Sequence, residues 1–145
     1  MRVVVQRVKS ASVRVGNQTI ASIDRGMLLL VGAGDGDNDD IVRKVADKLM
    51  NLRIFEDTEG KMNLSAKSIG AEFLVVSQFT LYADTSKGRR PSFVNALAPE
   101  EAEKLYLKFA AYLKESGFKT ETGKFGAKME VESINDGPVT LYIEE

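Results

Sequence analysis

The order of the apolar segments limits what this chain can fold into. Two segments with helical periodicity, 39–52 and 99–116, separate three groups of segments with the composition of strands. Groups of strands interrupted by single helices are typical of α+β domains. The 145 residues suffice for one core, so we expect a single α+β domain over 1–145. We expect two main helices and a largely antiparallel, barrel-like sheet built from 2–8, 12–15, 18–23, 27–33, 71–82, 118–122, 128–134 and 139–143.

The absent residue types exclude several chemistries. The chain has no Cys and no His, so a thiol nucleophile, a Ser-His-Asp triad and Cys- or His-bound metals are excluded. The segment 34–39, GDGDND, lacks the closing Glu of a calcium-binding loop, and we interpret it as a turn that caps the first helix. We expect no metal and no cofactor.

The charge and hydropathy patterns favour a cytoplasmic protein. The formal net charge is −1, so contact with a nucleic acid would require a local basic patch. The N-terminal residues interleave charges with Val, and the apolar run 27–33 is too short to span a bilayer. We therefore expect no association with a membrane.

Polar residues interrupt the most strand-like segment, 71–82. Ser77 and Gln78 stand where the apolar run should continue. Taken alone, they favour a strand end whose polar groups bond to neighbouring backbone. The alternative is a functional site there, with Thr80 as a second hydroxyl on the strand face opposite Phe79. No His is present to activate either hydroxyl.

Two further segments admit a structural and a functional interpretation. Lys87, Arg89 and Arg90 lie in a Gly/Pro-containing loop, where they form either solvated surface or a patch for nucleic-acid phosphates. Phe125 stands between two glycines and is followed by Met129. Such residues usually fill a core, but the glycines would let an aromatic ring approach a nucleobase closely.

The segment 135–140, NDGPVT, has an unusual composition for the start of a strand. Asn-Asp-Gly is typical of a tight turn, yet Pro138 removes a backbone donor where strand pairing should resume. The simple expectation is a bend before a last strand.

Together these motifs resemble the D-aminoacyl-tRNA deacylase family. The resemblance runs in family order through QRV (6–8), RIFED, GKMN, VVSQFTLYAD, KGRRPSF, TGKFGAKM and NDGPVT, and covers nearly the whole chain. SQFTL together with NDGPVT is its most specific part.

The resemblance implies a homodimeric hydrolase that cleaves the ester between a D-amino acid and the tRNA 3′ end, and that also removes glycine from mischarged tRNA. It implies that Ser77, Gln78, Phe79 and Thr80 surround the scissile ester. Phe125 and Met129 would contact the terminal adenosine. Gly137-Pro138 would be a cis dipeptide that enters the partner's pocket and excludes L-residues. Arg7 is a candidate to hold either this dipeptide or the strand that ends in Ser77-Gln78. The implied partners are aminoacyl-tRNA and a second copy of the chain, not DNA.

The missing His agrees with this chemistry, because an aminoacyl ester is already activated. We expect backbone amides around Gln78 and Phe79 to stabilise the oxyanion, with the terminal 2′-OH helping to move protons. A covalent mechanism through Thr80 is the alternative. The rival functions are an RNA-binding module without catalysis and a structural dimer that pairs its C-terminal strands.

Overall fold

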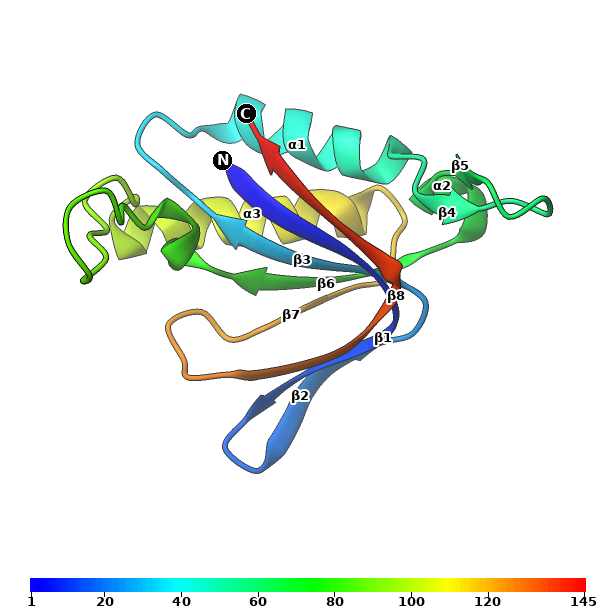
Figure 1. Cartoon of the computed structure of the whole chain (residues 1–145), viewed down its shortest axis with the longest axis horizontal. Coiled ribbons are helices and arrows are strands. Elements are labelled where there is room, and N and C mark those ends of the chain that lie inside the picture. The colour runs from blue at the N-terminus through cyan, green and yellow to red at the C-terminus, as the bar shows by residue number, and fades with distance from the viewer.

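Two long helices pack on one face of a curved, six-stranded sheet. The computed structural model describes all residues, 1–145, as a single α+β domain with a nearly closed, barrel-like sheet (Figure 1). The helices are α1 (Asp39–Asn51), α2 (Ala66–Ile69) and α3 (Pro99–Glu115), and a 3-10 helix, η1, spans Phe79–Tyr82. The main sheet contains β1 (Arg2–Val15), β2 (Gln18–Ile23), β3 (Gly26–Gly32), β6 (Glu72–Ser77), β7 (Thr120–Thr122) and β8 (Glu130–Glu144), and β4 (Phe55–Glu56) pairs with β5 (Met62–Leu64).

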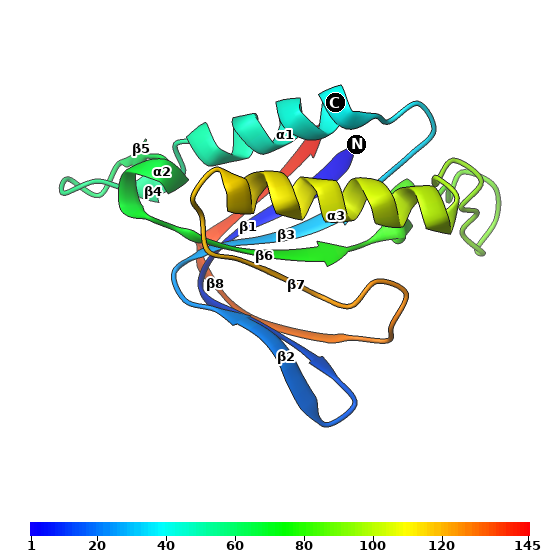
Figure 2. The ribbon, with the colours of Figure 1, turned by 180° about the vertical axis from the view of Figure 1, so that it is seen from behind.

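The sheet is mixed, which corrects the expectation of a largely antiparallel one. Strand β1 pairs antiparallel with β2, β3 and β8, but β3 with β6 and β6 with β7 are parallel pairs. Parallel neighbours need a long crossover connection. The segments containing α1 and α3 supply those crossovers, and both helices lie on the same face of the sheet (Figure 2). Hydrophobic periodicity in the sequence predicts where strands lie, but it does not predict whether neighbouring strands run parallel or antiparallel.

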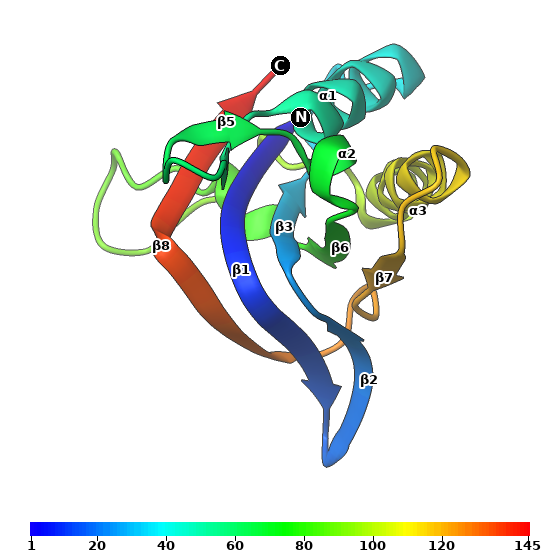
Figure 3. The same cartoon turned by 90° about the vertical axis from the view of Figure 1, so that its right-hand side faces the viewer.

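Side chains on the two sides of the curved sheet form two cores. The larger core lies between the sheet and helices α1 and α3, and includes Val3, Leu29, Phe73 and Phe109. The smaller core includes Val8, Val13 and Leu74, and β1 bends as it passes from one core to the other (Figure 3). None of the helices is long and apolar enough to cross a membrane.

The C-terminal segment forms one strand, not two strands around a turn. Strand β8 continues through Asn135–Thr140, but its register against β1 shifts there. Gln6 pairs with Thr140 and Val8 with Asn135, so residues 136–139 face only Arg7. The turn residues therefore form a bulge within a strand, and Gly137 has a φ of +124° that suits glycine.

The predicted strand 71–82 is also wrong in its second half. Strand β6 ends at Ser77, and the chain then turns into η1. The amide of Gln78 makes the last sheet hydrogen bond, 2.8 Å to the oxygen of Val31. Because Phe79 and Thr80 lie in a 3-10 helix, the expected alternation of their side chains across a strand does not apply.

Candidate active site

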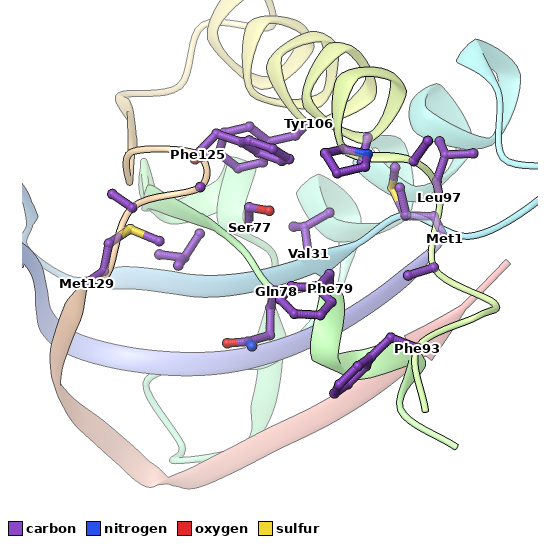
Figure 4. A pocket seen from close by; sticks show the side chains of 18 of the residues that line it. Met1, Val31, Ser77, Gln78, Phe79, Phe93, Leu97, Tyr106, Phe125 and Met129 are labelled. Atoms are coloured by element: carbon purple, nitrogen blue, oxygen red, sulfur yellow. The ribbon is translucent and has the colours of Figure 1, made fainter. Parts of the chain in front are cut away.

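A cavity of about 620 Å³ opens where β6 ends. The ends of β3 and β6, the loop 83–98, the start of α3 and the segment 123–131 surround it (Figure 4). Fifteen of its 19 lining residues are hydrophobic, and none is Asp, Glu, Lys or Arg. An apolar pocket with a few polar groups at one edge is the usual form of a small-ligand site.

The polar edge of the pocket comes from the end of β6. Ser77, Gln78 and Phe79 all line it. The hydroxyl of Ser77 makes no hydrogen bond within the chain, so it is free to meet a ligand. The side-chain amide of Gln78 donates to the hydroxyl of Thr80, which is exposed and does not line the pocket.

The expected oxyanion donors are only partly available. The backbone N–H of Gln78 is used by the sheet, in its hydrogen bond to Val31. The N–H of Phe79 opens η1, where an amide has no partner within the helix. Of these two amides, only that of Phe79 is left without a partner in the sheet.

One wall of the pocket depends on Tyr106, a buried residue of α3. Its hydroxyl shares its one proton between the oxygens of Val75, at 2.9 Å, and of Gly123, at 3.2 Å, and so joins α3 to β6 and to the segment after β7. Its ring lies 5.9 Å from that of Phe125. Burial raises the pKa of Tyr106 to about 12. A Tyr in an apolar helical stripe needs a partner for its hydroxyl, which was the available signal.

The predicted adenosine residues lie on this wall. Phe125 and Met129 both line the pocket, and both are half-buried. On the opposite side, Phe79 and Phe93 form an edge-to-face pair with centroids 5.0 Å apart, and Phe79 is 55% exposed. The pocket thus has aromatic rings on two sides.

The Gly137–Pro138 peptide bond is cis, and neither residue lines the pocket of its own chain. Both are exposed. Arg7, 2% exposed, donates from Nε to the oxygen of Asp136 at 3.1 Å and from Nη1 to that of Ile54 at 2.7 Å. Arg7 therefore holds the Gly-Pro bulge, as hypothesised from the sequence.

The basic residues of the loop lie outside the pocket. Lys87, Arg89 and Arg90 are all exposed, between Tyr82 and the pocket residue Phe93. No group of three or more acidic side chains could hold a metal ion.

The arrangement lacks a side-chain general base. Tyr106 is the only ionisable side chain that lines the pocket, and with a pKa of about 12 it stays neutral near pH 7. A reaction here must take its proton acceptor from the substrate or from water.

A model of the D-Tyr-tRNA(Tyr) deacylase family matches residues 4–144. This chain belongs to that family. The predicted family is therefore confirmed, and its members are enzymes, hydrolases that act on aminoacyl-tRNA. Similar members of this deacylase family, each named D-aminoacyl-tRNA deacylase, occur in Desulfatibacillum aliphaticivorans and Brevibacillus brevis. Each is 56% identical over 144 residues, which is 99% of both chains.

Solved structures support the fold of the deacylase family over the whole chain. A protein described as c-Myc DNA Unwinding Element Binding Protein is 41% identical, with a TM-score of 0.94 and coverage of 100% of this chain and 99% of its own. A probable eukaryotic D-amino acid tRNA deacylase, 20% identical, has a TM-score of 0.81 over 98% of this chain and 97% of its own, and supports the fold alone.

Proposed function

We propose that this chain hydrolyses the ester bond of D-aminoacyl-tRNA, and of mischarged glycyl-tRNA, to free amino acid and tRNA. The observation that carries the proposal is the uncharged pocket at the end of β6, lined by Ser77, Gln78 and Phe79 in a chain of the deacylase family. Its volume of about 620 Å³ suits an aminoacyl-adenosine end, and its aromatic walls suit the base.

The proposed mechanism relies on positioning and backbone donors. Water attacks the ester carbonyl, the N–H of Phe79 stabilises the oxyanion, and the bond to the ribose oxygen breaks. The ribose oxygen leaves with a proton relayed from the attacking water through the neighbouring 2′-OH. The absence of any Asp, Glu, Lys or Arg from the pocket lining supports this route. Thr80, outside the lining, is the less favoured covalent nucleophile.

Backbone atoms of Gly137-Pro138 would discriminate between the D- and L-forms of the substrate's amino acid. In a homodimer, Gly137-Pro138 of one subunit would enter the pocket of the other and occupy the space beside the substrate α-carbon. A D-residue or glycine fits there, whereas the Cβ of an L-residue would meet backbone. Each tenfold of discrimination requires about 1.4 kcal/mol, which a steric clash supplies readily.

Strand β8 supports the dimer. It carries the bulge and pairs only with β1, and its apolar side chains Ile134 and Tyr142 are 58% and 54% exposed. Covering this face with a second copy would bury those side chains and bring two Gly-Pro bulges to a shared interface.

The decisive assay follows release of free amino acid from D-Tyr-tRNA, L-Tyr-tRNA and Gly-tRNA. We expect rapid release from the D and glycyl substrates and none from the L substrate. Binding without release would favour the RNA-binding module instead, and neither binding nor release would favour the structural dimer. Equal release of D- and L-tyrosine would refute the main-chain filter.

A further inference from the structure

The segment that forms the aromatic wall also presents cations on its outer side. Along 124–129, exposed and half-buried residues alternate: Phe125, Ala127 and Met129 face the pocket, while Lys124 and Lys128 are exposed. A turn bond from the N–H of Ala127 to the oxygen of Lys124, 3.2 Å, holds the segment. The bond from Tyr106 to Gly123 fixes its base. The two lysines are thus carried by the structure that shapes the pocket.

A second group of cations lies on the loop beside the opposite wall. Asp84 and Ser92 exchange two backbone hydrogen bonds, of 2.7 and 2.9 Å, which close the base of the loop. Hydrogen bonds from the side chain and the backbone N–H of Ser86 lower the pKa of the Asp84 carboxylate. Lys87, Arg89 and Arg90 protrude from this closed loop. The loop and the segment 123–129 lie at the same end of the molecule in both opposite views (Figures 1 and 2).

None of these five cations has an anionic partner in the chain. They take part in none of the ion pairs, whereas some exposed lysines elsewhere, such as Lys108 with Asp39 and Lys119 with Glu72, are paired. Unpaired cations on both sides of a pocket without charged side chains complement a ligand that has no phosphate at its tip and is anionic behind it. The 3′ end of a tRNA has that charge pattern, since its phosphates begin behind the terminal nucleoside.

We propose that Lys124 and Lys128, together with Lys87, Arg89 and Arg90, form a cationic rim that binds the phosphates of the tRNA acceptor end as it leaves the pocket. This proposal rests on the proposed function. The rim supplies affinity for any tRNA, whatever amino acid it carries, and the pocket supplies the chemistry. The five residues of the rim therefore contribute to KM for tRNA and not to kcat.

The test measures binding of an uncharged tRNA transcript over a range of salt concentrations. The variants are Lys124→Ala/Lys128→Ala and Arg89→Ala/Arg90→Ala, and Lys67→Ala/Lys114→Ala is the control. The control removes two exposed, unpaired lysines from α2 and the C-terminal end of α3, at the other end of the molecule (Figure 1). Each rim variant should make the negative slope of log K against log salt shallower by about 1.4–1.8, for the loss of two phosphate contacts. The control should keep the wild-type slope.

Kinetics separate the rim from the active site. With D-Tyr-tRNA, each rim variant should raise KM by about twofold to thirtyfold, from two exposed ion pairs, at constant kcat. With D-tyrosyl-adenosine, which has no phosphates, it should match the wild type. Salt slopes equal to the wild type, or an equal loss with D-tyrosyl-adenosine, would overturn the rim. Failure of the wild type to hydrolyse D-Tyr-tRNA would refute the proposed function, while the salt slopes would still test the rim.

Discussion

The guanidinium of Arg7 donates a hydrogen bond to the backbone oxygen of Asp136, the residue before Gly137, over 3.1 Å. The same side chain also donates to Ile54, so one buried cation on β1 joins the Gly-Pro bulge to the chain after α1. The direction of the bulge therefore depends on a residue about 130 positions away in the sequence.

Replacing Arg7 with Met should loosen the bulge. The buried oxygen of Ile54 would lose its donor, which costs about 1–3 kcal/mol of the free energy of unfolding. We also expect weaker discrimination between D- and L-Tyr-tRNA. Urea unfolding and the release assay measure the two effects. Lys9→Met is the control, because Lys9 is exposed and lies 3.9 Å from the Asp136 carboxylate; an equal loss there would contradict the assignment.

Gly137→Ala should harm both folding and activity. A Cβ at Gly137 would lie 2.9 Å from Cγ2 of Val139 and 3.0 Å from Nη2 of Arg7, and the φ of +124° disfavours any side chain. We expect a loss of about 1–3 kcal/mol in unfolding free energy and at least about a tenfold slower release from D-Tyr-tRNA. Gly60→Ala, with φ +75° and no atom within 4 Å, isolates the backbone cost and should leave activity unchanged.

Separate Ser77→Ala and Thr80→Ala variants test the mechanism. If backbone donors and the 2′-OH carry the reaction, both should retain turnover within about tenfold of the wild type, which corresponds to about 1.4 kcal/mol. Single-turnover kinetics with D-Tyr-tRNA provide the measurement. An acyl-enzyme seen by mass spectrometry in the wild type, together with complete loss of turnover in Thr80→Ala, would establish the covalent route instead.

Tyr106 should make stability fall at alkaline pH. Burial raises its pKa from 10.0 to about 12, so the folded state keeps a proton that the unfolded state releases. The stabilisation is complete below pH 10 and is lost as the pH rises toward 12. Tyr106→Phe should be less stable at pH 8 by about 0.5–1.5 kcal/mol, for its lost hydrogen bonds, but should show a smaller decline above pH 10. Urea titrations from pH 8 to 11 would show this, and identical declines would contradict it.

A charge on the apolar face of β8 should separate the proposed dimer. Ile134→Glu places a carboxylate at a side chain that is 58% exposed in the single chain, so it should sediment as a folded monomer with little deacylase activity. Val94→Glu is the control, at a loop residue that is 82% exposed. A monomeric wild type would refute the dimer, and a dimeric Ile134→Glu variant would show that this face is not its interface.

Local sequence patterns located most of the elements. Helices α1 and α3 lie within a residue or so of the predicted ranges, because an Asn cap, an N-terminal Pro and one apolar stripe act over a single turn or face. The polar residues Ser77 and Gln78 suggested the end of a buried strand, although the predicted strand continued to residue 82. The sequence did not show that β6 lies parallel to both its neighbours, because strand direction depends on the path of the connection and not on the strand itself.

By itself, the sequence excluded Cys and His chemistry and marked Ser77 and Gln78 as polar residues at the end of an apolar run. Only the tertiary structure showed that no Asp, Glu, Lys or Arg lines the site. Only the tertiary structure decided that Tyr106 braces the wall of that site, that Thr80 stays outside it, and that residues 136–139 bulge opposite Arg7. The physical reason is the distance along the chain over which each kind of interaction acts. Composition and periodicity act between neighbours along the chain, whereas the partners of a buried hydroxyl or guanidinium are chosen by the packing of distant strands.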